Sequence, residues 1–344
     1  MWKLKTVGAS VLDQYAKEML PGLKERIKNG VKGGLFTLCS NDINVLIPNC
    51  GTSSEDDSVL LDLLKLEPEE LEKHCTKLMS SIIQKYNVND FQIYLENFKK
   101  QNLTGIEKAI VNKYKNKLTA LENIFDYDGQ ISHNADRSYW LARMKGINAC
   151  TYCNRQYTFT IEEYTSGSKI EHIARPELDH WFCKQLFPLM SLSFYNLIPC
   201  CHICNSSVKG NTIFSLATHV HPYLQKDFNP KIHFQQKLTT LGWSVVIDRR
   251  KGSREDNTVK EFKLEEIYKY HGPLEVNDLV EFNSAFSSDY LSTLYKKVLG
   301  DAYGNKSQAE VYRMLFGTEY NPDDFGARPL SKLKYDILKN LKVI

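Results

Sequence analysis

The chain has 344 residues, 42% of them hydrophobic and 25% charged, and a formal net charge of +3. These proportions are typical of an ordinary soluble protein. No apolar run reaches the roughly 18 residues that a transmembrane helix needs, and residues 1–10 lack the apolar segment of a secretory signal. A net charge this small also excludes coating of nucleic acid by bulk electrostatics, so such binding would depend on a local basic surface. We therefore expect a cytoplasmic protein with no membrane partner.

The first part of the chain is predicted to be mostly helical, because apolar residues recur there at helical spacing. The expected helices cover residues 10–20, 67–83, 106–125 and 138–145. Pro21 is expected to end or kink the first of them. No motif assigns a function to residues 1–130, which we expect to serve in partner docking or substrate gating.

From residue 150 the pattern changes to that of strands. We predict two strands and a helix start, at 157–164, 170–178 and 205–209, with a turn at 166–168 between the strands. Later elements are strands at 232–234 and 243–247, an exposed basic loop at 249–254, and helices near 262–268, 279–299 and 330–341. These elements predict an α+β fold, mainly helical, in three regions: a helical region at 1–130, a catalytic core at 131–225, and strands and helices at 226–344 that pack on the core.

Four of the nine cysteines form two Cys-x-x-Cys pairs, Cys150/Cys153 and Cys201/Cys204. Each such turn lets two thiolates reach one ion, and two turns supply the four ligands of a tetrahedral structural Zn²⁺. Without a secretory signal, this clustering favours metal thiolates over disulfides.

Other arrangements of these cysteines remain open. Cys200 is adjacent to Cys201, and Cys183 is near in sequence, so either could replace Cys201 as a ligand. Free core cysteines are the simplest alternative to a metal site, and two pairs around a polar segment argue against it. A thioredoxin-type redox site fits poorly, because no βαβ pattern surrounds the pairs.

Between the two pairs lie Asp179 and His180. A neutral histidine can deprotonate a water near pH 7, and a carboxylate can hold a hard divalent cation. Neighbouring side chains on a strand point to opposite faces, so these two residues share a site only if the strand ends or is bulged there.

Three segments together resemble the HNH (ββα-metal, His-Me finger) endonucleases in their zinc-stapled form: residues 178–180 (Leu-Asp-His), 196–199 (Asn-Leu-Ile-Pro) and 204–210 (Cys-Asn-x-x-x-Lys-Gly). The resemblance implies that His180 is the general base and that Asp179 and Asn205 bind Mg²⁺ or Mn²⁺. Asn196 would orient the histidine through its loop, and Lys209 would contact a phosphate. Many members carry a proline three residues after the base, where this chain has Cys183, which indicates a different loop geometry.

Further segments resemble a bacterial subgroup of these nucleases, similar to the nuclease component of Septu-type antiphage systems, which works with an ATPase. They include residues 187–189, 192–196, 221–223, 262–268 and 328–333. The resemblance implies an endonuclease, a hydrolase with DNA as the expected substrate, and an ATPase from the same operon as partner. It also implies cleavage to 5′-phosphate and 3′-hydroxyl ends.

Two other functions remain as alternatives. One is a non-catalytic zinc knuckle that binds DNA or a protein, and the other is a toxin-like enzyme that cleaves RNA. Arg249 and Arg250 in the basic loop could contact a nucleic-acid backbone or could be an ordinary solvated loop. His219 and His221 could bind a metal, although we favour a packing role for both.

Overall fold

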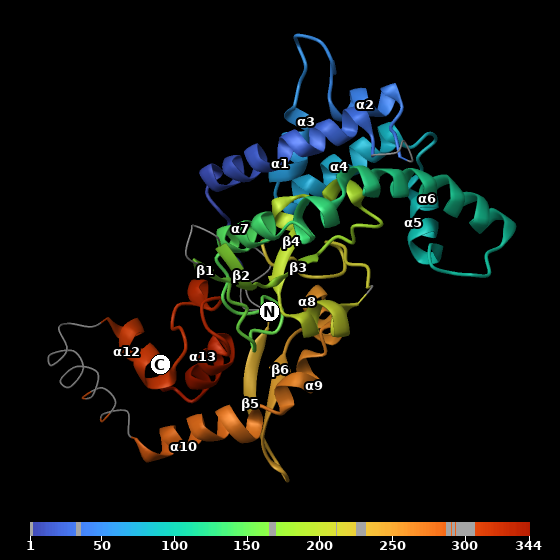
Figure 1. Ribbon diagram of the computed structural model, residues 1–344. Coiled ribbons are helices and arrows are strands. Elements are labelled where there is room, and N and C mark those ends of the chain that lie inside the picture. Colours follow the sequence, from blue (N-terminus) through green and yellow to red (C-terminus); the bar gives the residue numbers. More distant parts are fainter. Residues whose placement is uncertain are drawn as a thin grey trace. The chain divides into compact units, whose positions relative to one another are not determined.

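The computed structural model describes residues 3–31, 36–164, 170–210, 212–224, 232–286, 290, 293 and 307–344 (Figure 1). It is 54% helical with 11% in small antiparallel strand pairs, which agrees with the predicted α+β class. The chain forms two compact units: unit 1 contains residues 1–5, 145–178 and 199–344, and unit 2 contains residues 6–144 and 179–198. Among the described residues, no helix has both the length and the apolar character that crossing a membrane would need.

Unit 2 is helical. Its longest helices are α1 (Ala9–Asn29) and α6 (Gly105–Phe125), and α1 buries Tyr15, Met19, Leu23 and Ile27 at four-residue intervals. This continuous buried stripe extends on both sides of Pro21, so the helix passes through the proline. The expectation that Pro21 ends this helix was therefore wrong.

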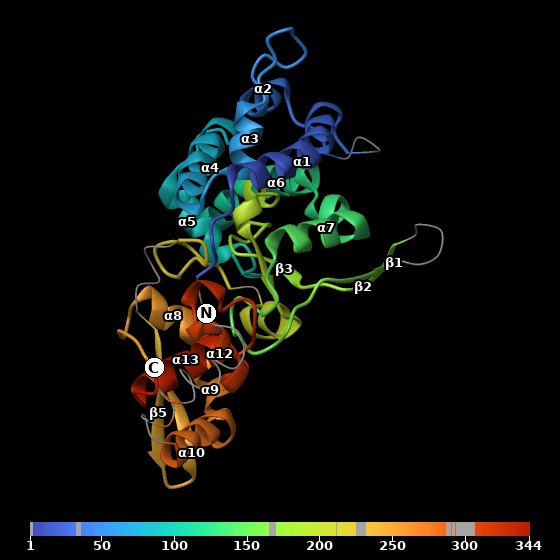
Figure 2. The same ribbon diagram turned by 90° about the vertical axis from the view of Figure 1, so that its left-hand side faces the viewer.

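The other elements of unit 2 pack on these two helices or on one another (Figure 2). They are α2 (Ser40–Leu46), α3 (Ser58–Lys65), α4 (Pro68–Ile82), α5 (Val88–Asn97), the π-helical turn η1 (Asp128–Ser132) and α7 (Ala135–Lys145). The sequence predicted α4, α6 and α7 but not the shorter α2, α3 and α5. Two of these helices begin with clear start signals in the structure: Pro68 occupies the first turn of α4, and Thr104 and Glu107 form a capping box at α6. The prediction of α6 rested on the spacing of its apolar residues and did not use the capping box.

Unit 1 contains two hairpins and most of the later helices. The hairpins pair β1 (Ile161–Tyr164) with β2 (Ile170–Ala174), and β5 (His233–Thr239) with β6 (Gly242–Asp248). The helices are α8 (Arg254–Glu261), α9 (Leu264–Lys269), the π-helical η6 (Gly272–Val276), α10 (Asn277–Ala285), α12 (Gln308–Phe316) and α13 (Ser331–Asn340). The predicted turn at 166–168 and much of the predicted helix at 279–299 lie outside the described residues.

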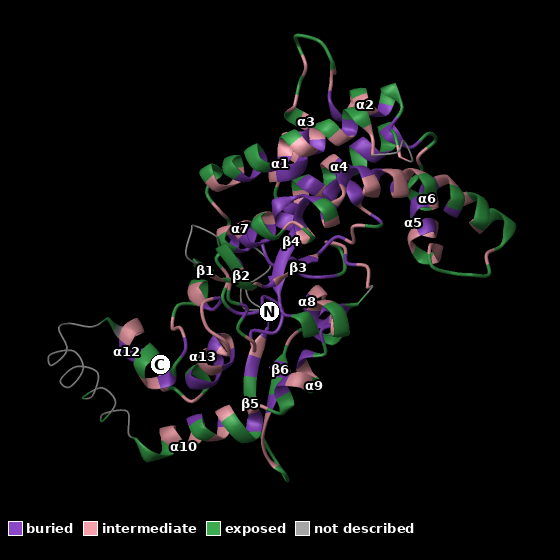
Figure 3. Cartoon of the chain, in the orientation of Figure 1, coloured by how far each residue is buried: buried purple, intermediate pink, exposed green. Residues whose placement is uncertain are grey.

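A third strand pair joins β3 (Glu177–His180) to β4 (Leu197–Cys200), and the π-helical η4 (Ile203–Lys209) follows. Every residue of β4 is buried, as Figure 3 shows. The predicted strand at 170–178 is interrupted, because Pro176 lacks the N–H that a strand ladder needs. β3 thus continues the predicted strand after a break, and β4, which was not predicted, lies between it and η4.

The compact units also divide the chain differently from the predicted regions. The segment 179–198 belongs to unit 2, whereas both cysteine pairs belong to unit 1. Aromatic contacts attach this segment to the helices: the hydroxyl of Tyr15 donates a hydrogen bond to the Leu192 carbonyl (2.7 Å), and its ring meets that of Phe194 edge to face. Contacts between residues so far apart in the sequence leave no local pattern to predict them.

Candidate metal centre and histidine loop

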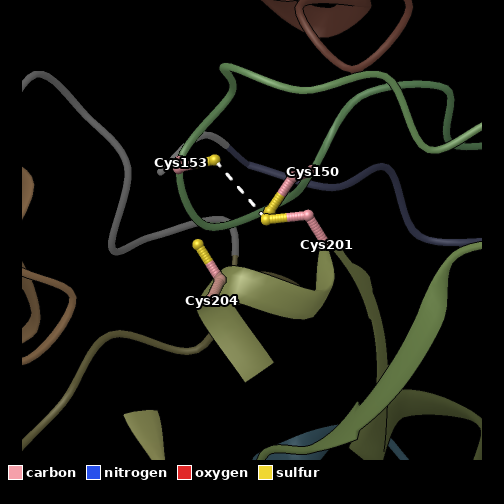
Figure 4. Close-up of side chains that lie close together, drawn as sticks. All are labelled: Cys150, Cys153, Cys201 and Cys204. Atoms are coloured by element: carbon pink, nitrogen blue, oxygen red, sulfur yellow. Dashed lines mark hydrogen bonds between the residues drawn. The ribbon is translucent and has the colours of Figure 1, made fainter. Parts of the chain in front are cut away.

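Four buried cysteines of unit 1 direct their sulfur atoms toward one another (Figure 4). They are Cys150, Cys153, Cys201 and Cys204, and all four sulfur atoms lie within 4.8 Å of one another. The Sγ atoms of Cys153 and Cys201 are 4.0 Å apart. Four sulfurs bound to Zn²⁺ at about 2.3 Å in a tetrahedron would be about 3.8 Å apart. The cluster therefore has the dimensions to hold a metal ion such as Zn²⁺.

The four cysteines that come together are the ones that the sequence singled out. Cys201 belongs to the cluster, and Cys200 is buried but is not part of it. The alternation of side chains along an extended segment explains why only one of these neighbours faces the other thiols. Cys183 lies in unit 2 and has no place in the group.

Both cysteine turns are closed in the same way, and both are followed by an asparagine. The Asn154 N–H donates to the Cys150 carbonyl (2.9 Å), and the Asn205 N–H donates to the Cys201 carbonyl (3.1 Å). Asn154 adopts a left-handed backbone conformation with φ of 50°, which asparagine accepts more readily than most residues. The repeated Cys-x-x-Cys-Asn sequence thus specifies two similar turns.

Later parts of unit 1 pack directly on the first turn. The Asn154 side chain donates to the carbonyls of Phe325 (2.9 Å) and Arg328 (3.3 Å). Phe262 stacks on Tyr152 with ring centroids 4.1 Å apart. The Tyr268 hydroxyl donates to the Cys153 carbonyl. The segments 262–268 and 328–333, which the sequence analysis singled out, therefore support the cysteine turn structurally.

Burial and the contacts among the four thiols change their pKa values in opposite directions. Burial raises the pKa of Cys150 well above its usual value, and hydrogen bonding among the thiols, first of all with Cys150, lowers the pKa of Cys153. Four adjacent thiolates in a buried site need a positive ion to balance their charge. The donor set and its burial thus fit a soft, thiolate-binding metal.

His180 lies in unit 2 and is the last residue of β3. The strand therefore ends at the Asp179–His180 pair, which is the condition for the two side chains to share a site. Its Nε2 is 3.0 Å from the Ser191 carbonyl oxygen, and its ring meets that of Tyr127 edge to face at 4.3 Å. A carbonyl only accepts hydrogen bonds, so Nε2 carries the proton and the lone pair of the neutral ring is at Nδ1. The Ser191 carbonyl thereby fixes both the tautomer and the orientation of the ring.

Asn196 is fully buried and closes the loop that follows His180. Its Oδ1 accepts from the Phe182 N–H (2.6 Å), and its Nδ2 donates to the carbonyls of Phe182 (3.1 Å) and Met190 (3.0 Å). Met190 immediately precedes Ser191. One side chain therefore holds both ends of the loop that positions the carbonyl opposite His180.

The two residues proposed to bind a catalytic cation belong to different units. Asp179 is buried in β3 and belongs to unit 2. Asn205 is half-buried in η4 of unit 1, where its Nδ2 donates to Glu177 (2.7 Å). Because Asp179 and His180 belong to unit 2 and Asn205 to unit 1, a shared site of these three residues stays a prediction.

The residues predicted to bind nucleic acid have contrasting environments. The Lys209 side chain is buried and lies over the Phe214 ring, 4.7 Å from its centroid. The Arg249 side chain is 2% exposed and pairs with Asp256 and Glu265. Only Arg250 is exposed. The prediction of an exposed loop at 249–254 was therefore wrong for Arg249, because two carboxylates hold its guanidinium inside unit 1.

His219 and His221 are packing residues in this structure, as we favoured. His219 stacks on Phe214 with centroids 4.1 Å apart, and its Nδ1 is 2.8 Å from the Thr218 hydroxyl. Burial lowers the pKa of His219 to about 4 and also holds the pKa of His221 well below its usual value. Both rings are thus neutral near pH 7.

Comparison with known proteins gives no family. No protein-family model matches the chain, and neither the curated proteins nor the solved structures contain a significant match. The likeness to HNH nucleases therefore depends on the motif residues alone.

Three residues that bear on these sites were not found from the sequence. Ser191 acts through its carbonyl, which every residue has, so no sequence signal could identify it. Asn154 could have been noticed, because it repeats the asparagine that follows the second cysteine pair. Glu177 could have been noticed from its position two residues before Asp179, on the same face of the strand.

Proposed function

We propose that this protein is a metal-dependent endonuclease that hydrolyses phosphodiester bonds, with DNA as substrate. The observation that supports this most strongly is the hydrogen bond between His180 Nε2 and the Ser191 carbonyl. It leaves the imidazole lone pair at Nδ1, and a general base needs that lone pair held in a fixed direction. Asn196 maintains the arrangement by fixing the loop at Phe182 and Met190.

In the proposed reaction, His180 accepts a proton at Nδ1 from a water whose oxygen attacks phosphorus in line. A bond forms between that oxygen and phosphorus, and the bond from phosphorus to the 3′ oxygen breaks. The departing oxygen takes a proton from solvent, which gives 5′-phosphate and 3′-hydroxyl ends. The half-buried position of the ring and its contact with Tyr127 limit its rotation.

Asp179 and Asn205 would hold a divalent cation, Mg²⁺ or Mn²⁺. Both side chains offer oxygen donors, which are the ligands that these hard cations prefer. When bound, such a cation neutralises charge on the phosphate and on the departing oxygen. The four cysteines suit a different metal and a different purpose, since buried thiolates bind Zn²⁺ in structural sites.

A plasmid assay tests this function. Zinc-loaded full-length protein should convert supercoiled DNA to nicked or linear forms in Mg²⁺, and EDTA should stop the reaction. A matched tRNA substrate separates the DNA-cleaving enzyme from an RNA-cleaving one. Plasmid retarded in a gel but never cleaved, with Mg²⁺ and the partner present, would instead support a non-catalytic zinc knuckle.

The biological setting that we propose is antiphage defence, with an ATPase from the same operon as partner. Its support is the sequence likeness of segments such as 187–189 and 328–333 to Septu-type nucleases. Co-purification of the products of the native operon tests it, and recovery of the nuclease without any ATPase would count against it.

A further inference from the structure

Glu177, the first residue of β3, connects a side chain within the second cysteine turn, His202, to one that follows the turn, Asn205. Its Oε2 accepts a hydrogen bond from Asn205 Nδ2 (2.7 Å), and its Oε1 is 2.6 Å from His202 Nδ1. All three residues belong to unit 1. The side chains of Glu177 and His202 are 35% and 72% exposed. Exposed ion pairs contribute only about 0–1 kcal/mol to stability. The contacts of Glu177 therefore add little to the stability of the fold, and another role is needed to explain them.

The contact with Glu177 determines which way the Asn205 amide faces. A carboxylate only accepts hydrogen bonds, so the amide atom against it must be the NH₂ group, however the amide oxygen and nitrogen are assigned. The amide oxygen of Asn205 then points away from Glu177. Turning the amide over would place two oxygens against each other without a proton between them.

We propose that Glu177 is a positioning residue that presents the Asn205 amide oxygen to the divalent cation. The inference rests on the proposed function, in which Asn205 is a cation ligand. Partners of this kind orient metal ligands in many sites, and their loss commonly weakens metal binding 10–100-fold. Here the partner is a carboxylate whose second oxygen is fixed in turn by His202.

The position of Glu177 in β3 favours this role. Residues two apart on a strand project from the same face, so Glu177 and Asp179 lie on one face of β3. One of these carboxylates is the proposed cation ligand, and the other holds the second ligand through its NH₂ group. β3 thus carries Asp179, a proposed cation ligand, and also Glu177, which orients the other proposed ligand, Asn205.

Direct Mn²⁺ binding to zinc-loaded full-length protein, without DNA, tests the inference. We expect Glu177→Ala to weaken Mn²⁺ binding 10–100-fold with unchanged zinc content. Glu177→Gln should stay within about threefold of wild type, because its amide oxygen can accept from Asn205 and its NH₂ group can donate to a ring nitrogen of His202. Glu171→Ala removes an exposed glutamate of β2 and is the control. The Mg²⁺ concentration for half-maximal cleavage should shift in the same order.

The outcomes separate this inference from the proposed function. Wild-type affinity in Glu177→Ala would overturn the positioning role and leave the function standing. Equal losses in Glu177→Ala and Glu177→Gln would also overturn it, because the charge would then matter rather than the orientation. A wild-type protein that binds no Mn²⁺ would overturn both. If Glu177→Ala loses zinc, Glu177→Met replaces it in the same measurement, because methionine keeps the length of the side chain but offers Asn205 no oxygen acceptor.

Discussion

The cysteine cluster of unit 1 and the histidine loop of unit 2 are positioned by different means. The cluster brings together four buried thiols, which become ligands only when a cation balances their charge. The loop is held by neutral hydrogen bonds of one buried asparagine. The order of the first region should therefore depend on metal, whereas that of the second should not. This difference can be tested one residue at a time.

The largest effect is expected when the metal site is broken. Cys201→Ser should lose zinc and destabilise unit 1 by more than about 3 kcal/mol, because metal binding to such sites contributes directly to folding. Zinc content and thermal unfolding measure this. Cys200→Ala is the matched control, and it should retain zinc because Cys200 lies outside the cluster. A folded, zinc-free Cys201→Ser protein would contradict a structural role for the metal.

Asn196→Ala should have the opposite effect to Cys201→Ser: it should destabilise unit 2 and leave the cysteine cluster intact. The change removes three hydrogen bonds and leaves buried partners unsatisfied, so we expect a loss of about 3 kcal/mol in the stability of unit 2. Zinc content should be unchanged. Imidazole NMR signals of His180 should shift, because the Ser191 carbonyl would no longer be fixed. An unaltered His180 signal would show that the loop keeps its form without this side chain.

A smaller effect separates the two neighbouring arginines. Arg249→Ala leaves Asp256 buried without its guanidinium partner, and we expect a loss of about 2 kcal/mol. Hydrogen bonds from Lys260 and the Gly252 N–H lower the pKa of Asp256 to about 2, so it stays charged at neutral pH. Arg250→Ala should change stability by less than about 0.5 kcal/mol and instead weaken DNA binding. Urea denaturation and a binding assay distinguish the two, and equal stability losses would contradict the assignment.

The sequence predicted those parts of the molecule that local spacing determines. The two Cys-x-x-Cys pairs predicted which four cysteines come together, and apolar residues at helical spacing predicted α1, α4, α6 and α7. The end of the strand at His180 was also anticipated, although the break at Pro176 was overlooked.

What the sequence could not supply were contacts between distant residues. The ion pairs that bury Arg249 and the aromatic contacts that attach residues 179–198 to α1 depend on tertiary packing. The bond from Asn205 to Glu177 joins residues separated by 28 positions. Local patterns specify ligand types and element starts, whereas the partners that orient those ligands come from the fold.

The most direct test of the central claim is cleavage of supercoiled plasmid by His180→Ala with and without added imidazole. Removing a general base costs about 10²–10⁴-fold in rate, so we predict a loss of at least about 100-fold with zinc content and stability unchanged. Free imidazole should restore part of the activity by replacing the missing base. A His180→Ala protein that nicks plasmid at the wild-type rate would contradict the account.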